Sequence, residues 1–141
     1  MRLSESPGYW IEEELMAHGI ARIGNDRYRT EITVSGHDLI ADEGAGLGGG
    51  NMGPAPYDLL LAGLGACTAI TLRMYADRKQ WPLEAVEVGL RLLNRDGLRI
   101  DRVLTIAGLD DEQMARLADI AERTPVTLTL KGGLPIDTRL A

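Results

Sequence analysis

The chain has 141 residues, of which 45% are apolar and 26% are charged. That length supports one compact core, so we expect a single domain over residues 19–141, preceded by an N-terminal extension at residues 1–18. The net charge of -6 and the lack of a basic patch argue against a nucleic-acid partner, because phosphate binding needs clustered lysines and arginines.

Targeting signals and metal motifs are both missing from the sequence. The N-terminus has no secretory core, and the longest apolar run is shorter than a membrane span and contains glycines and threonines. We therefore expect a cytoplasmic protein with no membrane partner. One cysteine and two histidines give no zinc spacing and no internal disulfide, so we expect no metal.

The first predicted elements are strands and a long loop. Residues 20–24 and 27–34 carry β-branched and aromatic residues around Asn25-Asp26, a pattern that predicts a hairpin. Gly36-His37 interrupts the chain before Leu39-Ile40-Ala41. Residues 42–56 hold six glycines and two prolines, which is the composition of a loop, and the loop is too long to be an idle connector.

The spacing Gly44-x-Gly46-x-x-Gly49 within this loop matches a dinucleotide-binding fingerprint. In that motif the third glycine opens a helix within a parallel strand crossover. Here residues 51–56 intervene and the neighbouring hairpins predict antiparallel strands. We therefore expect no nucleotide cofactor.

A long helix is predicted from Pro56 to about Lys79, because proline suits a helix start and good helix formers follow. Its first four turns are apolar all round, so the helix must be covered on every side. One small sheet covers one side, and the same helix of a second subunit would cover the other. Gly63 and Gly65 would permit close approach of a partner backbone, or they pack against the protein's own sheet.

A strand hairpin, a second helix and a last hairpin are predicted for the remaining chain. From Leu83 the apolar period is two, and the inward residues are Val86, Val88, Leu90 and Leu92, then Leu98, Ile100, Leu104 and Ile106 after a turn at Asp96-Gly97. Asp110 with Gln113 predicts the cap of an amphipathic helix that ends near Thr124. Alternation at Val126, Leu128 and Leu130 predicts a strand that pairs with residues 134–140. The fold class predicted by this order is α+β.

Cys67, the only cysteine, lies in the most apolar stretch of the chain, with no charge between Asp58 and Arg73. A thiol in such surroundings is an inert apolar side chain, or it is a nucleophile if a cation stabilises its thiolate.

Several motifs around this cysteine resemble the OsmC/Ohr family, which is named for osmotically inducible and organic-hydroperoxide-resistance proteins. The matching segments are Asp42-Glu43, the glycine loop, Gly53-Pro54-x-Pro56-Tyr57-Asp58-Leu59-Leu60-Leu61-Ala62, Gly65-Ala66-Cys67-Thr68, Thr71-Leu72-Arg73-Met74-Tyr75-Ala76-x-Arg78-Lys79 and Trp81-Pro82-Leu83-Glu84. The resemblance implies antiparallel sheets around a long buried helix, an intertwined homodimer, and a lineage that reduces organic hydroperoxides with cysteine.

In that lineage Cys67 would be the peroxidatic cysteine. The family's resolving cysteine lies in a Cys-Pro-Val-x-x-x-Leu element, where this chain has Thr124, so no internal disulfide can form. Asp58 matches the acid of one version of the family, whereas another version has its acid at the place of Tyr57. Asp58 is therefore either a catalytic carboxylate or a first-turn residue stabilised by the helix dipole.

The family also keeps an arginine near the thiol. We assign it to Arg29, with Arg22 and Arg27 as alternatives, although all three also suit a solvated hairpin face.

Two functions are compatible with these residues. The first is a one-cysteine peroxidase in which Cys67 reduces a small hydrophobic hydroperoxide and an external thiol regenerates it. The second is a redox-inactive protein that binds a hydrophobic ligand or a partner at the dimer interface. The persistence of Cys67 in its motif context favours the first.

Overall fold

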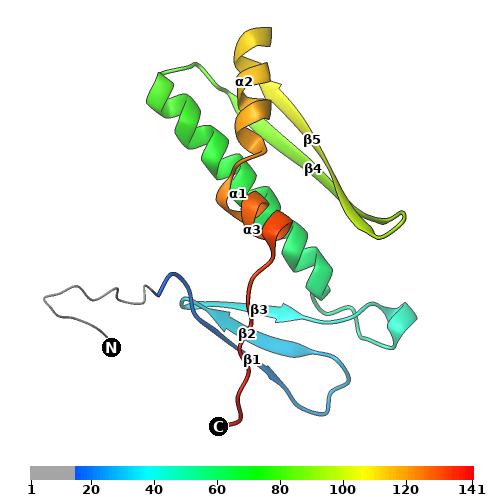
Figure 1. The fold of residues 1–141 in the computed structure, drawn as a ribbon. Coiled ribbons are helices and arrows are strands. Elements are labelled where there is room, and N and C mark those ends of the chain that lie inside the picture. The colour runs from blue at the N-terminus through cyan, green and yellow to red at the C-terminus, as the bar shows by residue number, and fades with distance from the viewer. Residues whose placement is uncertain (1–14) are drawn as a thin grey trace, which may run out of the picture. The chain divides into compact units, whose positions relative to one another are not determined.

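The computed structural model describes residues 15–141 (Figure 1). Most of the predicted N-terminal extension lies outside the described residues. The chain divides after Pro56 into two compact units, which are described separately. The described residues form two separate antiparallel sheets and three α-helices, which confirms the α+β class.

The first unit contains a three-stranded antiparallel sheet. Its strands are β1 (Gly19–Ile23), β2 (Thr30–Val34) and β3 (His37–Ala41), in the spatial order β1-β2-β3. The predicted hairpin is present, but Ile23 pairs with Thr30, so the connection spans residues 24–29 and is longer than a tight turn at Asn25-Asp26. Arg27 has a φ of 50° within this connection and cannot continue a strand there.

The glycine-rich loop after β3 is organised around Asp42, which is buried. Its carboxylate accepts hydrogen bonds from the backbone N–H groups of Met52, at 3.1 Å, and Glu43, at 2.8 Å, and these bonds hold its pKa below the ordinary value. A Cβ at Gly49 would overlap the Glu43 carbonyl, and one at Gly53 would overlap the Ile40 carbonyl. The glycines of this loop therefore allow its backbone to pack closely on itself and on the end of β3.

The second unit is built on α1 (Pro56–Lys79), whose bounds agree with those predicted. Strands β4 (Ala85–Asn94) and β5 (Leu98–Ala107) form the predicted hairpin, and both turn residues, Asp96 and Gly97, have positive φ. Helix α2 (Asp111–Ala121) starts with the predicted capping box, in which Asp110 accepts the Gln113 N–H at 2.8 Å.

The predicted last hairpin is wrong. Residues Pro125–Gly132 form a short helix, α3, and residues 133–141 contain no strand. Thr124 is extended, with a φ of -68° and a ψ of 154°, as suits the residue before a proline, and Pro125 then takes the first helical position. Five alternating residues were too short a segment to distinguish a strand from two helical turns.

The core of the second unit lies between α1, α2 and the β4-β5 sheet. It consists of Leu72, Ala76, Leu83, Leu117 and Ala121. The buried stripe of α1 is Leu64, Thr68, Leu72 and Ala76, four residues apart. Gly65 lies beside this stripe, and a Cβ there would stand 2.9 Å from a terminal methyl group of Leu90 on β4. The lack of a side chain at Gly65 lets the helix lie close to the sheet.

Another face of α1 is apolar and exposed. Ile70 is 53% and Met74 is 59% accessible, and Leu60 and Gly63 continue the same face. By length and composition α1 could also cross a membrane, with a mean hydropathy of 1.5. One such helix is weak evidence for a span, because core helices of soluble proteins have the same composition. The absence of a membrane partner stays a prediction.

Candidate functional site

Cys67 lies near the middle of α1 and is half-buried. The backbone N–H of Val126 donates a hydrogen bond to its Sγ at 3.5 Å, and the Thr71 hydroxyl lies 4.0 Å from the same atom. Val126 belongs to the first turn of α3, which crosses the middle of α1 (Figure 1). The sulfur therefore faces a helix N-terminus, where backbone donors and the helix dipole favour a negative charge.

Thr124, which occupies the predicted resolving position, is the buried N-cap of α3. An N-cap hydroxyl ordinarily accepts from a backbone N–H of the first turn, but here it pairs with the Thr127 hydroxyl at 2.6 Å. Pro125 has no N–H, so Val126 provides the first backbone donor of the helix. Because the Thr124 hydroxyl bonds to Thr127 and not to this N–H, the Val126 N–H donates to the Cys67 sulfur.

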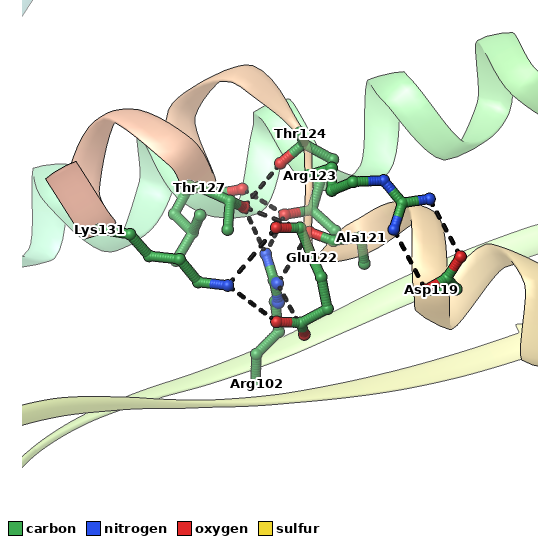
Figure 2. A network of polar contacts seen from close by, with 10 residues as sticks. Arg102, Asp119, Ala121, Glu122, Arg123, Thr124, Thr127 and Lys131 are labelled. Atoms are coloured by element: carbon green, nitrogen blue, oxygen red, sulfur yellow. Dashed lines mark hydrogen bonds and ion pairs between the residues drawn. The ribbon is translucent and has the colours of Figure 1, made fainter.

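Arg102 on β5 connects three helices through its guanidinium group (Figure 2). Its Nη1 donates to the hydroxyls of Thr68, at 3.0 Å, and Thr127, at 2.9 Å, and its Nη2 donates to the Ala121 carbonyl at 2.9 Å. The side chain is only 13% exposed. Arg102 therefore ties the residue after Cys67 to the end of α2 and the first turn of α3.

The sequence analysis missed Arg102, although the chain contains a signal for it. Arg102 occupies the inward position between Ile100 and Leu104 on β5, where every other residue of the series is apolar. A buried arginine must have hydrogen-bond partners, so a charge at an inward strand position indicates a polar network. The distant partners could not be identified from the sequence.

Further charged residues surround the outer side of this network (Figure 2). Glu122 pairs with Lys131 at 2.9 Å and with Arg102 at 3.6 Å, and these cations, Lys131 above all, hold the pKa of Glu122 below its ordinary value. Arg123 likewise lowers the pKa of Asp119 through a two-point contact at 3.0 and 3.1 Å. Both carboxylates are thus ionised at neutral pH.

Next to the network lies a cavity of about 500 Å³. Residues of α1, of the β4-β5 hairpin and of α3 line it, together with Glu122. Arg102 and Thr127 belong both to the network and to the cavity wall. The cavity could therefore hold a small molecule beside the first turn of α3.

Of the other predicted site residues, Asp58 lies on α1 away from the Cys67 sulfur, and Arg29 belongs to the first unit. Asp58 is exposed in the first turn of α1, as the helix dipole favours. It stands nine residues before Cys67, which is about 14 Å along the helix axis and on the opposite side. Arg29, in the first unit, pairs with Glu31 at 2.8 Å. Their catalytic roles stay predictions.

The two alternative arginines also belong to the first unit. Arg22 is exposed on β1, and Arg27 donates to the Gly48 carbonyl at 3.1 Å. No group of three or more potential metal ligands occurs within residues 15–141.

Comparison with solved structures identifies proteins of the same fold. An OsmC-like protein from Mycoplasma pneumoniae has 18% identity and a TM-score of 0.69, covering 86% of this chain and 90% of that one. The organic hydroperoxide resistance protein OhrB of Bacillus subtilis has 24% identity and a TM-score of 0.60, covering 84% and 92%. An organic hydroperoxide resistance protein OsmC from Legionella pneumophila has 22% identity and a TM-score of 0.60, covering 86% and 93%.

A search of curated proteins gives no match. A family model described as OsmC-like protein matches residues 48–139, a segment that holds Cys67, Thr124 and the whole Arg102 network. This segment is more than half of the chain and agrees with the fold of the solved structures, so the protein belongs to the OsmC-like family.

Proposed function

We propose that the protein is a thiol-dependent reductase of organic hydroperoxides in which Cys67 is the peroxidatic cysteine. The observation that carries the proposal is the Val126 N–H directed at the Cys67 sulfur from the start of α3. The thiolate is the nucleophilic form of cysteine, and its sulfur is a hydrogen-bond acceptor to which this N–H can donate. Membership of the OsmC-like family and the names of the Bacillus and Legionella proteins support the same chemistry.

The first half-reaction would oxidise Cys67. Its thiolate attacks the terminal oxygen of the hydroperoxide, an S–O bond forms and the O–O bond breaks. The alkoxide leaves and takes up the proton that the thiol has lost, which converts it to an alcohol. The cysteine is then a sulfenic acid, whose oxygen can accept the same Val126 hydrogen bond.

The second half-reaction would need an external thiol, because Thr124 has a hydroxyl where the family has a resolving thiol. The external thiol attacks the sulfenic sulfur, a mixed disulfide forms, and water leaves. A second thiol then releases Cys67 and forms the external disulfide. The proposed location in the cytoplasm suits this cycle, because cytoplasmic thiol pools are reducing.

Oxidation of Cys67 by cumene hydroperoxide tests the proposal. We expect a sulfenic acid that a dimedone-type probe traps, followed by sulfinic acid in excess peroxide, because no internal thiol intercepts the intermediate. Mass spectrometry of the labelled peptide measures both products. Turnover of the hydroperoxide should require an added thiol, and Cys67→Ser should abolish it. A Cys67 that reacts no faster than free cysteine would instead favour the redox-inactive binding function.

Restoring a thiol at the resolving position provides a second test. Val126 contacts the Cys67 sulfur, and position 124 is only two residues away, so Thr124→Cys should form a disulfide with Cys67 after one equivalent of hydroperoxide. Peptide mapping without reductant detects the bond. Thr105→Cys is the matched control, because Thr105 is exposed on β5 and alternates with the inward residues of that strand, so its side chain lies on the face of the sheet away from α1. Sulfinic acid at Cys67 beside a free Cys at 124 would contradict the predicted geometry.

A further inference from the structure

The walls of the cavity beside α3 are mainly apolar. Leu60 and Leu64 come from α1, Leu92 and Ile100 from the hairpin, and Leu130 from α3. Its volume, about 500 Å³, is in the range of small-molecule sites. Apolar side chains on three elements suit an aliphatic chain, because burying such a chain removes apolar surface from water.

Positive charge is in excess at the polar part of this cavity. Arg99, Arg102 and Lys131 line it, and Glu122 is the only carboxylate among its lining residues in the described chain. This excess stands out in a chain whose net charge is -6. An anionic ligand would therefore be attracted to this cavity, whereas the net negative charge of the chain would repel it elsewhere.

The three cationic side chains differ in how many hydrogen bonds and ion pairs they already form with other groups of the protein. Arg102 is bound to two hydroxyls and a carbonyl, and Lys131 pairs with Glu122. Within residues 15–141, by contrast, the Arg99 guanidinium has no hydrogen-bond or ion-pair partner. Its planar donor fork suits a carboxylate, and the Lys131 ammonium, which has three donors, lines the same cavity.

We propose that this cavity binds an amphipathic anion, an aliphatic chain that ends in a carboxylate, with the carboxylate held by Arg99 and Lys131. The proposal goes beyond hydroperoxide reduction, because a saturated carboxylate without a peroxide group should bind. The aliphatic part would lie against the leucines, and the charged end would lie beside Glu122 without displacing it from Arg102. Arg99 and Lys131 would thus set the charge specificity of the cavity.

Calorimetric titration with octanoate, octanol and octylamine, which share one chain length, tests this assignment. We expect octanoate to bind about tenfold more tightly than octanol, and octylamine to bind more weakly than both. Arg99→Gln and Lys131→Gln should each weaken octanoate binding about fivefold and leave octanol binding unchanged. Arg91→Gln is the matched control, because Arg91 lies on β4, pairs with Asp101 and does not line the cavity.

Several outcomes would overturn the assignment. Equal affinity for octanoate and octanol would show that the cavity selects only apolar ligands, and unchanged octanoate affinity in both variants would remove the role of the two cations. Lack of binding by all three probes would show that the cavity is not a ligand site. Cys67→Ser should bind octanoate like the wild-type protein, so this test can succeed or fail independently of peroxide reduction.

Discussion

Replacing Arg102 with alanine should lower the free energy of unfolding by about 3 kcal/mol, because the variant loses three charge-assisted hydrogen bonds and leaves space where a buried side chain had packed. Urea unfolding at one fixed protein concentration measures the change. Arg91→Ala is the control, since that arginine is exposed and has one exposed partner, and we expect it to change stability by less than about 0.5 kcal/mol.

A second variant separates the packing of Arg102 from its hydrogen bonding. Arg102→Met retains a long side chain but no donors, so we expect a smaller loss of stability than in the alanine variant. The reaction of Cys67 with hydroperoxide should nevertheless slow, because the first turn of α3 loses the link that places Val126 beside the sulfur. Wild-type stability in the alanine variant would show that the network contributes little to the folded state.

In the homodimer that we propose, replacing Ile70 with glutamate should weaken association by roughly 100-fold or more and leave a monomer, because the change places an unpaired charge among apolar side chains. Leu60, Gly63, Cys67, Ile70 and Met74 follow one another at spacings of three and four residues and lie within about 80° around α1. This stripe is exposed apart from half-buried Cys67. We propose that the α1 stripe of a second copy covers it.

Sedimentation equilibrium at micromolar concentration measures this association. Ala115→Glu adds the same charge at an exposed position of α2 and should stay dimeric. A wild-type protein that sediments as a folded monomer would contradict the interface. Since Cys67 lies within the stripe, the monomeric variant should also expose its thiol to alkylating reagents more than the control does.

The elements predicted correctly are those whose signals are local. The capping box of α2 and the turn at Asp96-Gly97 depend on residues a few positions apart, and the length of α1 follows from an apolar segment between Pro56 and Lys79. The resemblance of the segment around Cys67 to the OsmC family was specific enough to predict the fold class, which the solved structures confirm.

The residues around the thiol were harder to predict, because their contacts join distant segments. Arg102 reaches Thr68 across 34 positions and Thr127 across 25, and no pattern within β5 identifies those partners. The same network explains the error in α3. The Thr127 hydroxyl contacts Arg102 and the Thr124 hydroxyl, and this tertiary bonding supports a helical turn in a segment rich in β-branched residues.

Gly65 has a consequence for the direction in which the thiol faces. A Cβ at Gly65 would stand 2.9 Å from a Leu90 methyl group, so α1 packs closely on β4 at this residue, with no side chain of its own in between. Cys67 follows two positions later, about 200° around the helix. The side of α1 that packs on Leu90 is therefore nearly opposite the side that carries the sulfur, and the close packing at Gly65 leaves Cys67 facing away from that contact.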